Sequence, residues 1–287
     1  MLFFDVKNPQ FNCSKNHRFL TIAGISGALV SSILLWGNVA KADLKISPIT
    51  IETEINRGQA QGTITATNGD AKDFRARVYT QPFTYDVEEG IKFLDSSPQD
   101  LAPYLQFSPR ELEVPGNDER RIRFLVRVPP SLPDGEYRTM LFTENLEATI
   151  QEENNPTTGV IFKTSIVPRI GVAVYVRKGK ISHNLTVVKA RFNTQNKKLQ
   201  LLAKNTGKAS VIVQGNWVIK QGNKEIYKGL GMDTTVIAEN ERYINVDYST
   251  SANPLQLKSG EYELSGHLGW GVNRIQKTPF TVKFTVP

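Results

Sequence analysis

Histidines and paired acidic residues are the side chains in this chain whose types could support catalysis. His183 and His267 lie far apart in the sequence, and the single cysteine, Cys13, lies close to the N-terminus. Neither a zinc site with the usual ligand spacing nor a Cys–His pair can be written from them. The acidic pairs at 118–119 and 152–153 fall in predicted turns, where solvation explains their charge. We therefore predict a protein that is not an enzyme and that uses no metal and no cofactor.

The segment 159–167 offers a different chemistry, which is the pairing of its backbone with another chain. Phe162 and Ile166 share one phase of this predicted strand, and Ile161 and Val167 share the other. A strand that is apolar in both phases can face its own domain on one side and a partner on the other. The sequence leaves open which phase faces the partner. A final strand that pairs with no partner is the alternative.

Two stretches, LPDGEYRTML at 132–141 and LKSGEYELSG at 257–266, repeat a Leu, a Gly-Glu-Tyr group and a strand-like run. A Tyr near the start of a late strand is typical of the tyrosine corner of immunoglobulin (Ig)-like sandwiches, in which the phenol bonds back to the backbone. Tyr137 and Tyr262 are therefore predicted to be structural tyrosine corners. Trp217 lies on the third strand of the second series, where such folds bury a Trp.

The elements that would hold these residues are strands, because no long stretch has a helical period. One series of strand-like runs extends from residue 49 to residue 167, and a second series starts near residue 185. The chain of 287 residues has the length of two domains. We predict an all-β protein with two Ig-like β-sandwich domains in tandem, at 43–178 and 179–287, joined by the polar segment VRKGKIS.

The first 42 residues are predicted to be a signal peptide. Residues 19–36 form an uncharged run that follows Lys15 and Arg18, and the sequence AKA at 40–42 is a small-x-small cleavage pattern. An uncleaved membrane anchor is the alternative, because a run of this length just reaches the length needed to span a bilayer. No second run of that length occurs, so we expect no stable membrane insertion after cleavage.

Charge and cysteine content narrow the class of protein further. The predicted mature chain has no cysteine, and an exported protein without disulfides fits the bacterial envelope, either the periplasm or the secreted fraction. The formal net charge is +7 for the whole chain and falls when the leader is removed. We expect no nucleic-acid partner, because Arg121, Arg123 and Arg127 fit the solvent face of one strand.

The stretch FSPRELEVPGNDERRIRFLVRVPPSLPDGEYRTMLFTENL, at 107–146, resembles the first domain of periplasmic pilus-assembly chaperones of the PapD-like family. The features that carry the resemblance are a Pro before a short strand, a Pro-Gly turn, an arginine-rich strand and the Gly-Glu-Tyr corner. The resemblance extends over about residues 46–177. The second domain resembles the family by topology and length alone.

The resemblance implies two Ig-like domains arranged as a boomerang that bind an unfinished pilin-like subunit. The chaperone lends the last strand of its first domain, and backbone pairing with apolar side chains gives the affinity. The partners would be pilin-like or other exported β-rich subunits, with an outer-membrane usher. The alternative is a structural or adhesive Ig-like envelope protein without chaperone activity, including a carbohydrate-binding module that stacks sugars on Trp217 or Trp270.

The resemblance also implies an anchor for the terminal carboxylate of the client. The family uses an Arg in the first strand and a Lys in the last strand of the first domain, whereas this chain has Glu52, Glu54 and Val172 there. Glutamates would repel a carboxylate. Either the anchor is rebuilt from other cations, or the chain does not grip a free C-terminus. The candidate anchor residues are Arg169, Arg177 and Lys178.

We predict that the exported protein starts at Asp43, because the cleavage pattern ends at Ala42. N-terminal sequencing of the protein from the envelope fraction would measure this directly. Recovery of the chain from membranes with residues 1–36 still attached would contradict the prediction.

Overall fold

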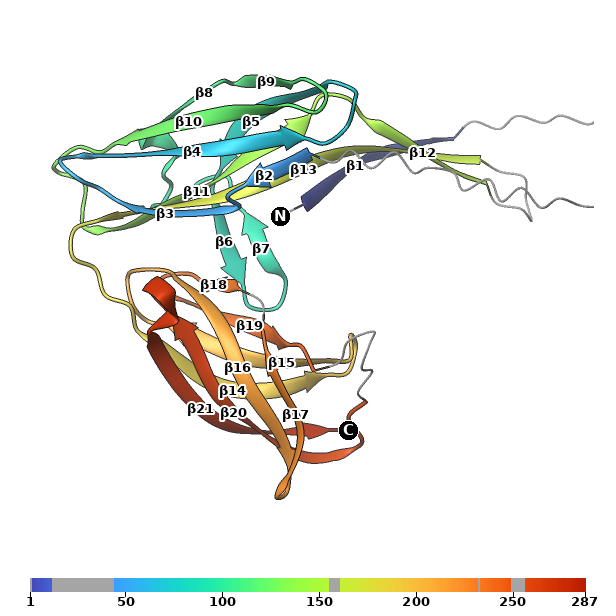
Figure 1. Ribbon diagram of the computed structural model, residues 1–287, viewed down its shortest axis with the longest axis vertical. Helices are drawn as coiled ribbons and strands as arrows, with labels where there is room; N and C mark the ends of the chain where they lie inside the picture. The colour runs from blue at the N-terminus through green and yellow to red at the C-terminus, as the bar shows by residue number, and fades with distance from the viewer. Residues whose placement is uncertain (1, 12–43, 155–160, 232, 249–255) are drawn as a thin grey trace, which may run out of the picture.

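The computed structural model describes residues 2–11, 44–154, 161–231, 233–248 and 256–287. These residues form strands and two short 3-10 turns, and the strands build two sandwiches that meet at an angle (Figure 1). The predicted all-β fold with two Ig-like sandwiches in tandem is confirmed. Among the described residues, no helix is long and apolar enough to cross a membrane.

The first sandwich consists of a four-stranded sheet packed against a larger one. The smaller sheet has the order β2 (Leu44–Ser47), β4 (Gln59–Asn68), β10 (Glu119–Arg127) and β8 (Leu105–Ser108). The larger sheet has the order β1 (Leu2–Phe11), β13 (Ile161–Lys178), β11 (Gly135–Asn145), β5 (Phe74–Gln81) and β9 (Glu111–Val114). Two further strands, β3 (Thr50–Glu54) and β12 (Thr149–Asn154), also pair with β13. A hairpin of β6 (Phe83–Asp86) and β7 (Gly90–Phe93) extends towards the second sandwich (Figure 1).

The second sandwich has the same two-layer plan. One sheet has the order β14 (Leu185–Asn193), β15 (Lys198–Asn205) and β19 (Asn240–Val246). The other has the order β17 (Lys224–Leu230), β16 (Val211–Gln221), β20 (Gly260–Trp270) and β21 (Gln276–Val286), and β18 (Thr234–Val236) pairs with β16.

Alternation of apolar and charged residues places β10 over the first core. Ile122, Phe124 and Val126 are buried, whereas the arginines at 121, 123 and 127 are exposed. Because successive side chains of a strand point to opposite faces, this pattern fits one orientation of the strand only.

Trp217 is the largest fully buried side chain and forms the centre of the second core. Its ring lies against the backbone of two glycines, so close that a Cβ at Gly215 would lie 1.9 Å from the ring and one at Gly231 would lie 2.1 Å from it. Both positions must therefore lack a side chain for the ring to fit. Burial also removes Trp217 from any role in stacking a sugar at the surface.

The two repeated tyrosines make equivalent bonds. Tyr137 Oη donates to the carbonyl of Pro133 at 2.9 Å, and Tyr262 Oη donates to the carbonyl of Lys258 at 2.8 Å. Each phenol bonds to the backbone four residues upstream, which is the geometry of a tyrosine corner.

The predicted domain boundary is near Lys178. In the structure, β13 ends at Lys178 and β14, the first strand of the second sandwich, begins at Leu185. The boundary near Lys178 stays a prediction.

The predicted cleavage site and the uncharged run before it lie outside the described residues, whereas residues 2–11 of the same predicted leader form β1.

We expect Tyr137→Phe and Tyr262→Phe each to lower the free energy of unfolding by about 1–3 kcal/mol, because a buried backbone acceptor loses its donor. Denaturant unfolding of the mature chain would measure the loss. Tyr175→Phe is the matched control, because the Tyr175 hydroxyl is buried without a hydrogen-bond partner among the described residues. Equal stability of all three variants and the wild type would contradict the prediction.

Candidate functional site: a strand edge and an interdomain junction

The last strand of the first sandwich, β13, has different neighbours along its two edges. On one edge, β11 pairs with residues 169–178 and β12 pairs with residues 161–166. On the other edge, β3 runs parallel to β13 and covers only residues 173–177. Within the described chain, the sandwich proper therefore leaves residues 162–170 of this edge without a neighbour.

The N-terminal segment of the chain lies along that stretch. β1 runs antiparallel to β13, with Leu2 opposite Ile170 and Phe11 opposite Phe162 (Figure 1). β1 belongs to the segment that we predict to be removed on export, and its removal would leave the edge bare. The unpaired N–H and C=O groups of such an edge are a template for pairing with another chain. The position of β1 indicates that there is room for an added strand.

Side chains of β13 alternate between the core of the first sandwich and a second apolar cluster. The residues on the core-facing phase are Val172, Val174 and Val176, and Ile170 packs beside them. Ala173 and Tyr175 have the opposite phase and belong to a cluster that includes Ile237 of the second sandwich. The phase that faces the first core is thus the even-numbered one.

The same alternation assigns phases to the predicted pairing residues. Because the side-chain period of a strand is two, Phe162 and Ile166 occupy positions on the core-facing phase. Ile161 and Val167 occupy positions on the phase that faces the second sandwich. These residues precede the part of β13 that β3 covers.

A buried carboxylate joins the two sandwiches. The side chain of Glu136, on β11, has no exposed surface. The N–H of Ser210, from the second sandwich, donates to Glu136 Oε2 at 2.8 Å, and the Ser210 hydroxyl donates to Oε1. The hydroxyl also accepts a hydrogen bond from the N–H of Ala238 at 3.0 Å. Glu136 therefore ties a strand of the first sandwich to two segments of the second.

Two arginines balance the charge of Glu136. Arg177 Nε donates to Oε2 at 3.4 Å, and the Arg138 guanidinium lies 3.9 Å from Oε1. Burial lowers the pKa of Arg138, and the negative charge of Glu136 opposes that shift. Arg177 also donates to Glu52 at 2.8 Å. Burial raises the pKa of Glu52, and the charge of Arg177 opposes that shift.

Contacts made by the hairpin of β6 and β7 extend the junction. Phe83 and Tyr85, on β6, pack in the cluster that contains Ile237. The Asn240 side chain donates to the carbonyl of Tyr85 at 3.2 Å. At the hairpin turn, Arg191 Nη1 donates to a carboxylate oxygen of Glu88 at 2.8 Å. The second sandwich is thus held by the hairpin as well as by Glu136.

The three predicted anchor cations lie in different surroundings. Arg177 is engaged by Glu136 and Glu52 as described, and Lys178 Nζ donates to the carbonyls of Pro130, at 3.0 Å, and Leu132. Both belong to the internal bonding of the first sandwich and its junction. Arg169 Nη1 donates to Tyr79 Oη at 3.0 Å, and its guanidinium lies over the ring of Phe142 at 4.5 Å. Of the three, Arg169 lies within the stretch of β13 that β3 leaves uncovered.

Among the described residues considered for catalysis or sugar binding, His183 and Trp270 lie together, and their contacts are structural. His183 packs against the ring of Trp270 at 5.3 Å, and burial lowers its pKa. Trp270 Nε1 donates to Thr278 at 3.1 Å. Among the described residues, no group of three or more His, Cys, Asp or Glu side chains could hold a metal ion.

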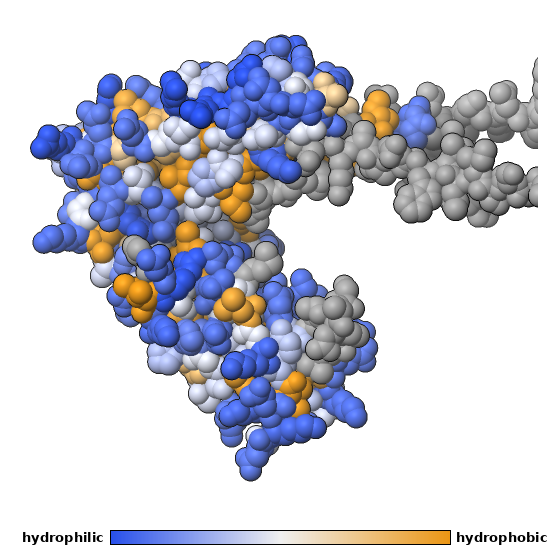
Figure 2. Space-filling model, in the orientation of Figure 1, coloured by the Kyte–Doolittle hydropathy of each residue, from blue (hydrophilic) through white to orange (hydrophobic). Residues whose placement is uncertain are grey.

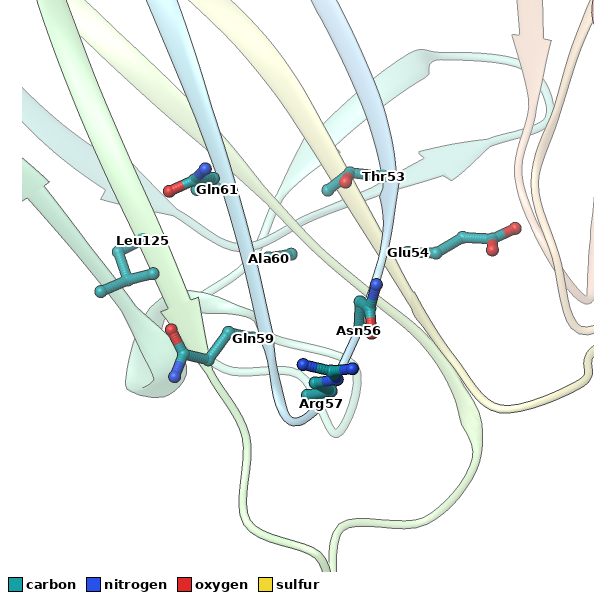
Figure 3. Close-up of a pocket in the computed structure, with 8 residues that line it drawn as sticks. All are labelled: Thr53, Glu54, Asn56, Arg57, Gln59, Ala60, Gln61 and Leu125. Atoms are coloured by element: carbon teal, nitrogen blue, oxygen red, sulfur yellow. The ribbon is translucent and has the colours of Figure 1, made fainter.

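A separate hollow of about 580 Å³ lies at the turn between β3 and β4 (Figure 3). Its lining includes Arg57, Gln59 and Gln61, and the carboxylate of Glu54 points away from all three (Figure 3). The two charged groups do not converge on one point, so the hollow has no arrangement for acid–base chemistry.

Sequence reasoning missed Glu136 and its partner Ser210. Glu136 stands in the repeated Gly-Glu-Tyr group, and its counterpart Glu261 is exposed. The repeat therefore contained a signal for a contact between the domains. An acidic residue that occurs in both copies can be buried in one of them, where the other domain packs over it. Nothing in the sequence around Ser210 points to a carboxylate partner.

No family model and no curated protein matches this chain. A chain of the CsuC–CsuE chaperone–tip adhesion subunit pre-assembly complex of Acinetobacter baumannii is similar over 86% of this chain and 100% of its own, with 15% identity and a TM-score of 0.46. The class 5 fimbriae chaperone CfaA is similar over 85% of this chain and 100% of its own, with 13% identity and a TM-score of 0.43. Likenesses at this level carry no weight for function, which must be inferred from the geometry of this chain.

We expect Glu136→Ala to lower the free energy of unfolding by about 3–5 kcal/mol, because it leaves the buried Arg138 without its opposing charge and the two Ser210 donors without an acceptor. It should also broaden the distribution of distances between the sandwiches, which small-angle X-ray scattering would measure. Glu144→Ala is the matched control, because Glu144 is a buried carboxylate of the same strand that pairs with Arg77 inside the first sandwich. Broadening in both variants, or in neither, would contradict the role of Glu136 as the tie between the sandwiches.

Proposed function

We propose that this protein is a chaperone-like factor of the bacterial envelope that binds exported β-rich subunits by lending them a strand. The observation that carries the proposal is the edge of β13 over residues 162–170, which β3 leaves uncovered and along which β1 lies. An extended client segment added there would gain a ladder of backbone hydrogen bonds. Removal of the predicted leader would expose this edge in the mature protein.

The composition of the two phases indicates which one fills the client. Phe162 and Ile166 continue the even-numbered phase ahead of Ile170, the first residue of β13 that packs in the first core cluster, whereas the other phase includes Lys163 and Ser165. A client that lacks a strand has an open apolar groove, and a row of apolar residues complements such a groove. We therefore assign Phe162 and Ile166 to the client.

The partners follow from the same mechanism. Subunits that lack a strand of their own, such as pilin-like proteins, are the class of client that a lent strand completes, and an outer-membrane usher would receive them. The compartment would be the periplasm, in agreement with the predicted leader.

A structural or adhesive envelope module is the competing function. Such a module gains nothing from an unpaired edge, and exposed edges carry a risk of aggregation. The uncovered stretch of β13 is thus better explained by a client than by a passive role.

We expect the double variant Phe162→Glu and Ile166→Glu to lose its client, because each buried apolar side chain contributes about 1.5–3 kcal/mol. The double variant Ile161→Glu and Val167→Glu is the matched control on the opposite phase and should retain most binding. Capture from envelope extract followed by mass spectrometry would measure both, with circular dichroism as a check on folding. If both folded variants keep the same partners as the wild type, β13 is not the lent strand.

A further inference from the structure

The outward face of the four-stranded sheet, formed by β2, β4, β10 and β8, is rich in positive charge. Side chains alternate along a strand, so the exposed Arg121, Arg123 and Arg127 of β10 point away from the core that Ile122 and its neighbours fill. Glu119 is the single acidic residue in these four strands, and it pairs with Arg121 at 3.6 Å. The face therefore attracts anions.

The strands beside β10 surround its arginines with hydroxyl and amide groups. Arg123 lies opposite Thr63 of β4 and Ser108 of β8, and Arg127 lies opposite Gln59 of β4. Along the top of the space-filling view, the surface over β8 and β10 is mainly hydrophilic (Figures 1 and 2). The face thus offers hydrogen bonds between its charges.

The hollow of about 580 Å³ at the turn between β3 and β4 continues this face (Figure 3). Gln59, Gln61 and Leu125 line the hollow, and Gln61 lies opposite Leu125 in the ladder of β4 and β10. Arg57 lines it from the turn, and Glu54 directs its carboxylate away (Figure 3). The hollow therefore presents amide and guanidinium donors to a ligand.

Arg57 has a backbone conformation that is unfavourable for its type. Its φ is 49°, in the left-handed region, and Asn56 and Gln59 exchange backbone hydrogen bonds of 2.8 and 3.0 Å across the turn. The first central residue of such a two-residue turn is usually Asn, Asp or Gly. Strained residues of this kind cluster at functional sites. The strain indicates that the Arg57 side chain has a role beyond the turn.

Three arginines of this region have donors to spare. Within the described ranges, no hydrogen bond or ion pair engages the side chain of Arg57, Arg123 or Arg127, whereas Arg120 pairs with Asp118 at 2.6 Å. A guanidinium binds a carboxylate through two parallel hydrogen bonds. Arg123 and Arg127 are about 13 Å apart along an extended strand. A linear polymer with repeated carboxylates can therefore contact both.

The side chains of the face discriminate between classes of anionic polymer. The aromatic residues of these strands, Phe107 and Phe124, have the inward phase, so no ring on them can stack nucleic-acid bases. A protein interface needs an apolar centre, and a membrane surface needs apolar side chains that insert into it. The amide and hydroxyl groups match the hydroxyls of a sugar chain, which can also enter the hollow.

We infer that this face and the hollow at its end bind a linear glycan that carries carboxylate groups. Arg123 and Arg127 pair with carboxylates along the glycan, Arg57 pairs with one at the hollow, and Gln59 and Gln61 bond to sugar hydroxyls. The inference goes beyond the proposed function, because β13 belongs to the other sheet of the sandwich. A client on β13 would leave this face uncovered, so the protein could hold a client and a glycan together.

The test measures binding of the mature chain to a linear oligogalacturonate and to its methyl ester, which has the same sugar chain without the charges. Isothermal titration calorimetry would give both affinities. We expect the acid to bind at least about tenfold more tightly than the ester, because charge-assisted hydrogen bonds are stronger than neutral ones. Added salt should weaken binding of the acid, since exposed charges are screened.

Two sets of variants locate the site. The double variant Arg123→Gln and Arg127→Gln should lose most of the preference for the acid. Arg57→Asn should weaken binding of the acid severalfold without lowering the melting temperature, because Asn adopts the left-handed conformation more readily than Arg.

The double variant Lys224→Gln and Lys228→Gln is the matched control. It removes the same charge from β17, at the edge of a sheet of the second sandwich, where both lysines are exposed. This variant should keep the affinity of the wild type for the acid and its preference over the ester.

Equal affinity for acid and ester, or an equal loss in the control variant, would overturn the site. Polyglutamate or phosphatidylglycerol vesicles that bind as tightly as the oligogalacturonate would overturn the assignment to a glycan. All these results are separate from strand lending, which the variants of β13 test.

Discussion

The buried carboxylate of Glu136 is the constraint on which the arrangement of the two sandwiches depends. A charge without exposed surface is stable only where donors and opposite charges converge on it. Here the donors come from both sandwiches, since Ser210 supplies two and Arg177 supplies one. Separation of the sandwiches would remove both Ser210 donors from the buried Glu136, so the docked arrangement is strongly favoured. Docking in turn brings Ile237 against the apolar residues of β6 and β13.

The C-terminal end of β13 is fixed mostly within the first sandwich. Arg177 donates to Glu136, to Glu52 and to the carbonyl of Ser210 in the second sandwich, and Lys178 donates to carbonyl groups of the first. The earlier part of β13, over 162–170, has no neighbour on one edge apart from β1 among the described residues. A strand held in this way is already extended, so a client would not bear the full entropy cost of ordering it. Rigidity at one end thus favours binding at the other.

Local patterns predicted the fold well, and contacts between the domains escaped them. The repeated Gly-Glu-Tyr group identified both tyrosine corners, and the alternation in β10 identified the first core, because both patterns depend on neighbours within one domain. The same group contains Glu136 and Glu261, one buried and one exposed. Their identical local sequence cannot encode that difference, which arises only because the second sandwich packs over the first.

The chemistry of β13 limits what the open edge can pair with. Lys163 and Ser165 place polar groups on one phase. Charges on an edge strand oppose indiscriminate pairing between copies. A partner must therefore supply an apolar groove for the other phase, a condition that an incomplete sandwich can meet and a generic exposed strand cannot. The edge is thus free to pair with a client strand, yet its polar residues disfavour pairing with other strands. Both properties can be read from the sequence once the register of β13 is known.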